Sequence, residues 1–174
     1  IFILIISFLF GIGLNAQTLS TDVVAAPSVG TSVDVPIYTN SIPDVLSLTI
    51  YLEYNNTVLS YTSFTDNIGF SSIAVTAQSS SVLKILISGP FPAGTSIPDG
   101  NVVDVHFDYL GGFSDIKFHT TTYGTWASTY TELPPNFTVF NFTNADVTNG
   151  SVNGTYYSTT IDGGDWNTST DWTA

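Results

Sequence analysis

The stretch LSLTIYLEY, residues 46–54, is the clearest β-strand signal in this chain. Its even-numbered residues are all apolar or aromatic, whereas its odd-numbered residues are Ser, Thr, Tyr and Glu. A period of two predicts a strand with one face in the core and the other toward solvent or a partner. We therefore expect one set of side chains to be buried, namely Leu48, Ile50, Leu52 and Tyr54. The opposite set is expected to face outward, namely Ser47, Thr49, Tyr51 and Glu53.

Short apolar or alternating runs continue on both sides of this stretch, at residues 33–37, 82–87, 103–109, 116–118, 137–142 and 147–152. Gly, Pro, Asn and Asp separate these runs and mark turns. In one of the turns, Asp99-Gly100, the glycine is expected to supply a positive φ. No segment after Ser20 keeps a helical period for more than two turns. Many short strands at this spacing predict an all-β fold, an antiparallel β-sandwich.

The composition excludes several classes of function. The chain has 174 residues, of which 43% are hydrophobic and only 9% charged, and its net charge is -12. Lys84 and Lys117 are its only cations besides histidine. A chain of this charge repels phosphate backbones and anionic membranes, so we expect no nucleic-acid partner. It contains no cysteine, which excludes disulfides, thiol nucleophiles and thiolate metal sites.

The apolar run IFILIISFLFGIGLNA, residues 1–16, is typical of a secretory signal peptide that is cleaved before Gln17. It is shorter than the ~20 residues of a spanning helix, although an uncleaved N-terminal anchor is the alternative. We predict the sandwich domain at residues 17–154, with no stable membrane insertion after cleavage. The composition changes at residues 155–174, which are expected to be a linker or the start of a second module.

Titratable residues are few and stand in no catalytic motif. Asp104, His106 and Asp108 are spaced by two, so they share one sheet face. That face is either simply solvated, or a polar docking patch or weak cation site. Glu53 and Glu132 are the only glutamates, and neither belongs to the paired carboxylates that glycosidases require. We expect a non-enzyme with no catalytic residues, no cofactor and no metal site.

Aromatic residues gather in the Thr- and Ser-rich segment TTTYGTWASTY, residues 120–130. Exposed rings of Tyr123 and Trp126 would stack on the apolar faces of sugars. Alternatively, Trp126 is part of the core, as large aromatic side chains usually are. The sequence leaves both readings open.

Four motifs occur in an order and spacing that resemble the cohesin family: TSVDVPIYT, LSLTIYLEYNNTVLSY, DGNVVDVHFDYL and VTNGSVNG. The resemblance covers residues 21–154 and implies a jelly-roll sandwich from a larger secreted bacterial protein. It also implies that a dockerin helix docks on the outward residues of the strand at 46–54. Dockerin-binding cohesins typically carry Asn and Asp where this chain has Ser47 and Thr49, so the chain departs from the pattern there.

Two functions from different classes remain. The first is an extracellular or cell-surface binding module of cohesin type, whose partner is a dockerin-like protein or a polysaccharide. Its candidate binding residues are Ser47, Thr49, Tyr51, Glu53, Tyr123 and Trp126. The second is a structural spacer within a large cell-surface or adhesin-like protein.

Overall fold

The computed structural model describes residues 16–26, 28–69, 72–88, 96–121, 129–132, 138–154, 157–158 and 172–173. All regular secondary structure in these ranges is β-strand. None of it is a helix of the length and apolarity that a membrane span requires. The predicted signal peptide lies outside the described residues except for Ala16, and so does most of the segment after residue 154.

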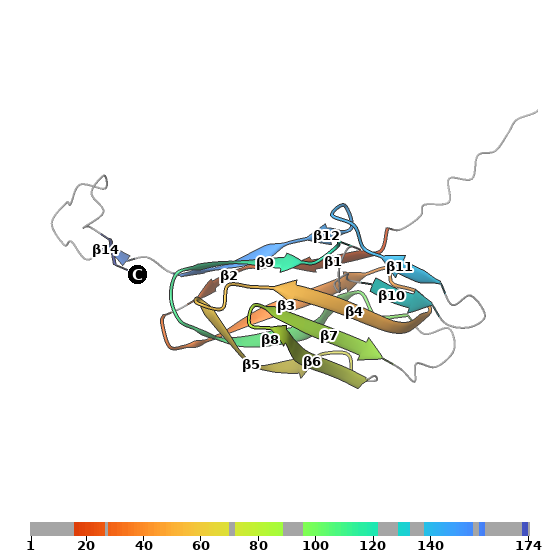
Figure 1. The fold of residues 1–174 in the computed structure, drawn as a ribbon, viewed down its shortest axis with the longest axis horizontal. Helices are drawn as coiled ribbons and strands as arrows, with labels where there is room; N and C mark the ends of the chain where they lie inside the picture. The colour runs from red at the N-terminus through yellow and green to blue at the C-terminus, as the bar shows by residue number, and fades with distance from the viewer. Residues whose placement is uncertain are drawn as a thin grey trace, which may run out of the picture.

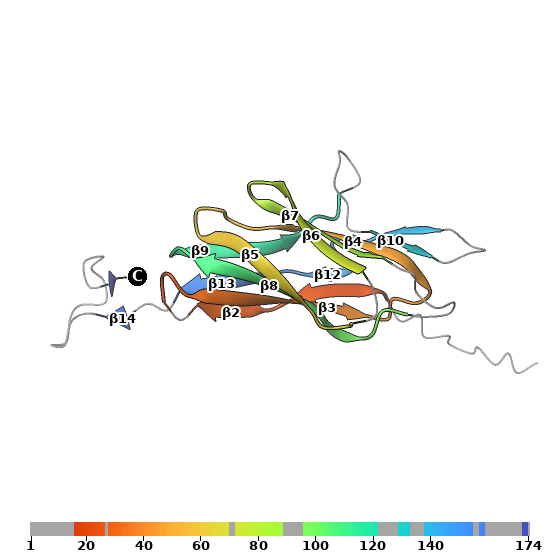
Figure 2. The ribbon, with the colours of Figure 1, turned by 90° about the horizontal axis from the view of Figure 1, so that it is seen from below.

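The strands form two sheets that face each other (Figures 1 and 2). The smaller sheet has five strands in the order β12-β1-β3-β8-β5. Their bounds are β12 (Val147–Thr148), β1 (Thr18–Thr21), β3 (Ser32–Asn40), β8 (Gly100–Tyr109) and β5 (Leu59–Asp66). The β3 and β8 strands pair antiparallel along nearly their whole length and form the centre of this layer.

The larger sheet has eight strands and is built around β4 (Val45–Glu53). On one side of β4 lie β7 (Val82–Ser88) and then β6 (Ser72–Ser79). The other side of β4 pairs first with β10 and, at its end, with β9. The remaining bounds are β9 (Phe113–Phe118), β10 (Thr129–Glu132), β11 (Val139–Asn141), β13 (Gly150–Gly154) and β2 (Val23–Ala26). A separate two-stranded sheet pairs β14 (Tyr157–Ser158) with β15 (Trp172–Thr173).

The core lies between the two sheets and confirms the predicted register of β4. Leu48, Ile50 and Leu52 are fully buried, and Tyr54 is only 7% exposed. Its ring lies 4.9 Å from that of Phe107 on the opposite sheet, measured between ring centroids. Each buried aliphatic side chain of this kind contributes about 1.5–3 kcal/mol to folding.

The alternation fails at one end of β4. Val45 is buried, whereas Leu46 is 38% exposed. Against β10, Thr131 is paired with Ser47 and Glu132 with Val45, so Leu46 is an extra residue on β4. Such a β-bulge shifts the side-chain period by one residue. The apolar face of this strand therefore runs through Val45 rather than Leu46.

The first and last strands of the domain run parallel to each other. β1 pairs parallel with β12 in the smaller sheet, and β2 pairs parallel with β13 in the larger sheet. Both ends of the chain thus cross from one sheet to the other, the first at Asp22 and the second at Asn149. The sandwich is as predicted, with these two parallel pairs added to its antiparallel ones.

Close approaches explain two glycines of β13, the first of which lies at the crossing. A side chain at Gly150 would place its Cβ 2.0 Å from the carbonyl oxygen of Asp22. A side chain at Gly154 would meet the hydroxyl of Tyr109. The sequence-based prediction of a single strand at residues 147–152 is wrong, because the chain leaves one sheet at Thr148 and joins the other at Gly150.

Stability is expected to fall in alkali. Burial raises the pKa of Tyr54 and Tyr61 above 10.0, and a hydrogen bond to Asp22 is the main cause that raises the pKa of Tyr38. A raised pKa in the folded state stabilises the protein fully below the unfolded value. That contribution is lost as the pH rises from about 10 through the folded-state pKa.

Tyr54→Phe should therefore make the free energy of unfolding fall less steeply with rising pH, because the phenylalanine ring stays buried and has no ionisable group. Urea unfolding between about pH 8 and pH 11 measures the free energy of unfolding for both proteins. Equal slopes for the wild type and the variant would contradict the assignment.

Candidate functional site

The four outward residues of β4 lie in the middle of the larger sheet. Ser47, Thr49, Tyr51 and Glu53 stand opposite Ser88, Leu86, Lys84 and Val82 of β7. On β6, the next strand, Ala74 is level with Leu86 and Thr76 with Lys84. Paired residues share a face of a sheet. We call the surface formed by Ser47, Thr49, Tyr51, Glu53, Ala74, Thr76, Lys84 and Leu86 the β4 face.

The centre of the β4 face carries a single charge, that of Lys84. Thr49, Leu86 and Ala74 form a row across three strands, and Tyr51 and Lys84 form part of the next. Tyr51 is therefore an aromatic side chain beside one lysine on a surface otherwise made of hydroxyl and aliphatic groups. The cores of protein–protein interfaces share this composition, because charged side chains are costly to desolvate there and tyrosine is enriched.

Charged groups gather at the Glu53 end of the β4 face. Glu53 Oε2 lies 3.0 Å from His119 Nε2, and Lys117 Nζ lies 2.8 Å from Asp115 Oδ2. The hydrogen bond from Lys117 to Asp115 raises the pKa of the lysine. The backbone N–H of His119 also donates to the Tyr51 carbonyl at 2.9 Å. The two contacts of His119 join β4 to the end of β9 and fix the backbone beside Tyr51.

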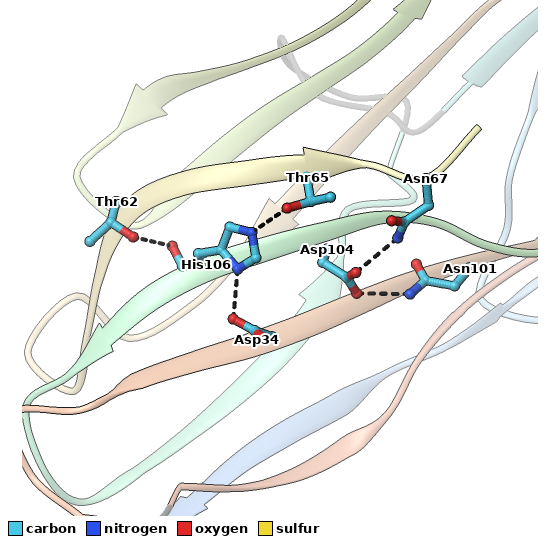
Figure 3. A network of polar contacts seen from close by, with 7 residues as sticks. All are labelled: Asp34, Thr62, Thr65, Asn67, Asn101, Asp104 and His106. Carbon is cyan, nitrogen blue, oxygen red and sulfur yellow. Dashed lines mark hydrogen bonds and ion pairs between the residues drawn. The ribbon is translucent and has the colours of Figure 1, made fainter. Parts of the chain in front are cut away.

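The outer face of the smaller sheet has a different chemistry (Figure 3). His106 Nδ1 lies 2.6 Å from Asp34 Oδ1, and His106 Nε2 lies 2.7 Å from the hydroxyl of Thr65. Asp104 accepts hydrogen bonds from the amides of Asn67 and Asn101, both at 2.8 Å. The prediction that Asp104, His106 and Asp108 share one face is confirmed by their register against β3. We call this surface, with Asp34, the acidic face.

The two faces differ in charge. Lys84 and Lys117, the only lysines, are both on the outer side of the larger sheet, and the chain has no arginine. The acidic face carries Asp104 and Asp108 on β8 and, on the neighbouring strand β3, Asp34 opposite His106. A partner of low or negative charge is therefore repelled less by the β4 face than by the acidic face.

The predicted site residues fall into two groups. The structure brings Ser47, Thr49, Tyr51 and Glu53 together on the β4 face, whereas Tyr123 and Trp126 lie outside the described residues. Lys84, Leu86, Ala74 and Thr76 were missed because nothing in the sequence shows which strands flank β4. The near-continuous apolar run at 82–87 hides which of its residues face outward, and β6 was not predicted at all.

Solved structures of similar fold are cohesins. The sixth cohesin of scaffoldin B from Acetivibrio cellulolyticus, in complex with a mutant Cel5 dockerin, is 21% identical with a TM-score of 0.64, over 80% of this chain and 99% of that one. The OlpA cohesin of Clostridium thermocellum, in complex with dockerin Doc918, is 15% identical with a TM-score of 0.63, over 81% and 100%. A non-cellulosomal cohesin from the archaeon Archaeoglobus fulgidus is 17% identical with a TM-score of 0.60, over 80% and 91%.

These comparisons establish the fold. No protein-family model matches the chain, and no curated protein sequence matches it. The structural similarity covers the sandwich at identities that preserve a fold but do not by themselves carry function. The chain has the cohesin fold, as the resemblance of its four motifs predicted.

Proposed function

We propose that this chain is a non-catalytic protein-docking module that binds a dockerin-like partner on its β4 face. Several of the similar cohesins, including the first two described above, were solved in complex with dockerins. The observation that carries the proposal is the outward position of Tyr51 on the β4 face, where Lys84 is the one charged neighbour paired with it. The run at residues 1–16, interpreted as a signal peptide, supports a location outside the cell or on its surface.

Ser47 and Thr49 depart from the residues typical of dockerin-binding cohesins, and this difference limits the chemistry of the proposed partner. Where dockerin-binding cohesins typically offer an amide and a carboxylate, this chain offers two hydroxyl groups. A hydroxyl both donates and accepts hydrogen bonds but carries no charge. The proposed partner therefore presents neutral hydrogen-bonding and apolar side chains to this part of the face, rather than a cluster of basic residues.

Tyr51→Ala is expected to weaken partner binding at least about tenfold, because loss of a central aromatic anchor costs about 2 kcal/mol. The probe is an array of the dockerin modules encoded in the same genome as this chain. Surface plasmon resonance then gives Kd for any module that binds. The matched control is Tyr38→Ala on the outer side of β3, where the same truncation should leave Kd unchanged.

Two results would contradict the proposal. In the first, no dockerin module binds the wild-type chain. In the second, Tyr38→Ala weakens binding and Tyr51→Ala does not, which would place the partner on the smaller sheet. Thermal melting of both variants confirms that each remains folded.

The spacer function is the alternative, and one observation favours it. The described sandwich begins with β1 and ends with β13. β1 pairs in parallel with β12, and β13 pairs in parallel with β2. The chain therefore enters the sandwich at one end and leaves it at the opposite end. A module with this layout continues a linear string of domains. Polysaccharide binding at Tyr123 and Trp126 stays a prediction, because both residues lie outside the described ranges.

A further inference from the structure

A notch opens at the end of the larger sheet where two strands separate. β4 and β9 pair only at Leu52 with Phe118 and at Glu53 with Lys117. Beyond Glu53, β4 ends and the chain turns toward β5, whereas β9 continues backward from Lys117 to Phe113 beside β13. The space between them has a volume of about 380 Å³ and is lined by Glu53, Tyr54, Asn55, Asn56, Ser81, Phe113, Asp115 and Lys117.

One wall of the notch is an exposed aromatic ring. Along β9, Ser114 and Ile116 are buried, so Phe113, Asp115 and Lys117 all face outward. Phe113 is 52% exposed, among the most exposed large apolar side chains in the described part of the chain. The face of an aromatic ring carries partial negative charge and attracts weakly positive C–H groups. Phe113 can therefore act as a platform for the apolar side of a flat ligand.

The charged groups that line the notch have close neighbours. Asp115 is paired with Lys117 at 2.8 Å, and Glu53 lies 3.0 Å from the imidazole of His119, which is charged only when protonated. An anion gains no free cation here, because Lys117 is held by Asp115. The same carboxylates keep free lone pairs, because an ionised carboxylate has about four acceptor positions.

Amide groups complete the polar lining. The Asn55 side chain is used within its own turn, where its Oδ1 accepts from the backbone N–H and the hydroxyl of Thr57. Within the described part of the chain, no hydrogen bond from the Asn56 side chain is found, so its amide can both donate to and accept from a ligand. The notch thus joins one aromatic ring to an ion-paired carboxylate, a second carboxylate and a neutral amide.

We propose that this notch binds a sugar unit of a neutral polysaccharide. The C–H side of a pyranose would stack on Phe113, and its hydroxyls would bond to Asn56 and to the carboxylates of Glu53 and Asp115. The volume lies in the range of small-ligand sites, about 300–1,000 Å³. The sugar site adjoins the β4 face and shares Glu53 with it, but its aromatic platform and its amide lie outside that face.

The test is isothermal titration calorimetry of the full chain with cellohexaose, xylohexaose, mannohexaose and laminarihexaose. We expect at least one of these to bind, and Phe113→Ala to weaken it at least tenfold. Phe113→Tyr should retain binding because the ring is kept. Val139→Ala is the matched control, since Val139 is 55% exposed on β11, and it should change nothing.

The salt dependence tests the neutral character of the ligand. Addition of about 0.5 M NaCl should leave the affinity unchanged, because screening acts on charged ligands only. Asn56→Ala should weaken binding several-fold and serves as a second variant if Phe113→Ala does not fold. Tyr51→Ala should leave sugar binding intact, so failure of the docking proposal and failure of this one are distinguishable.

Three outcomes would overturn the sugar site. One is the absence of binding to all four hexasaccharides. Another is full binding by both Phe113→Ala and Asn56→Ala, which would place the sugar elsewhere on the chain. The third is salt-sensitive binding of pentagalacturonate in preference to the neutral sugars, which would make the notch an anion site at Lys117.

Discussion

Ile50→Asp is expected to leave the chain unfolded. Ile50 is fully buried at the middle of β4, between the paired Ile85 of β7 and the opposite sheet. The substitution removes about 2–3 kcal/mol of apolar burial and adds a carboxyl group that must be desolvated without a partner. A total cost of roughly 5 kcal/mol or more equals the whole stability of many domains. Circular dichroism should show loss of the β spectrum at room temperature.

The control for this prediction is Thr49→Asp, one residue earlier on the same strand. Its side chain faces outward, so the new carboxylate stays hydrated and the domain should fold with a similar melting temperature. If Ile50→Asp kept the wild-type melting temperature, the register of β4 would be wrong. If both variants unfolded, the effect would belong to charge in this strand rather than to burial.

Gly150→Ala is expected to cause the second largest loss of stability. An added Cβ would lie 2.0 Å from the Asp22 carbonyl oxygen and 2.7 Å from its carbon. Both atoms belong to the backbone, so no side-chain rotation relieves the contact. The strands must move apart, which breaks the hydrogen bond from Ser151 N to the same carbonyl. We expect a loss of about 3 kcal/mol or more, at the upper end of overpacking effects.

Gly30→Ala separates this effect from ordinary glycine strain. Gly30 has a φ of +82° and open space around its Cβ position, so the substitution carries only the backbone cost. That cost is about 1 kcal/mol. Urea unfolding should rank the two variants clearly. A free energy of unfolding for Gly150→Ala equal to that of Gly30→Ala would show that the crossing is looser than described.

Much of the sandwich could be predicted from the alternation of apolar and polar residues along each strand. The alternation in LSLTIYLEY gave the correct buried face from Leu48 to Tyr54, because a half-buried strand has no other way to satisfy both environments. Gly100 has a φ of +113°, as expected for its turn. Such features are local, and local sequence determines them.

The missed strands share a physical cause. β6, with the sequence SIAVTAQS, pairs only with β7 among the described strands, and its side chains are small and mostly exposed. An edge strand of this kind needs little apolar surface, so its pattern is weak. In β5 a register shift between Tyr61 and Ser63 breaks the period. The bulge at Leu46 likewise could not be anticipated without knowing the partner strand.

For the candidate sites, the sequence predicted which residues of one strand share a face, but not which strands lie beside it. Ser47, Thr49, Tyr51 and Glu53 follow from one strand, so their common face was predicted. The β4 face as a whole depends on neighbours more than 20 residues away, and Lys84 reaches Tyr51 only through strand pairing. The notch beside Phe113 depends on where two strands part, which no short motif encodes.

The parallel pairing of the first and last strands also determines how the module carries load. A pull on the residues before β1 and after β13 acts along β1–β12 and β2–β13, since the chain enters and leaves at opposite ends. Hydrogen bonds between such strands are loaded in shear and must fail together, whereas those of a peeled hairpin fail one after another. Gly150 keeps the start of β13 in close contact with the Asp22 carbonyl between β1 and β2. A domain with this layout therefore resists opening when tension is applied at these two ends.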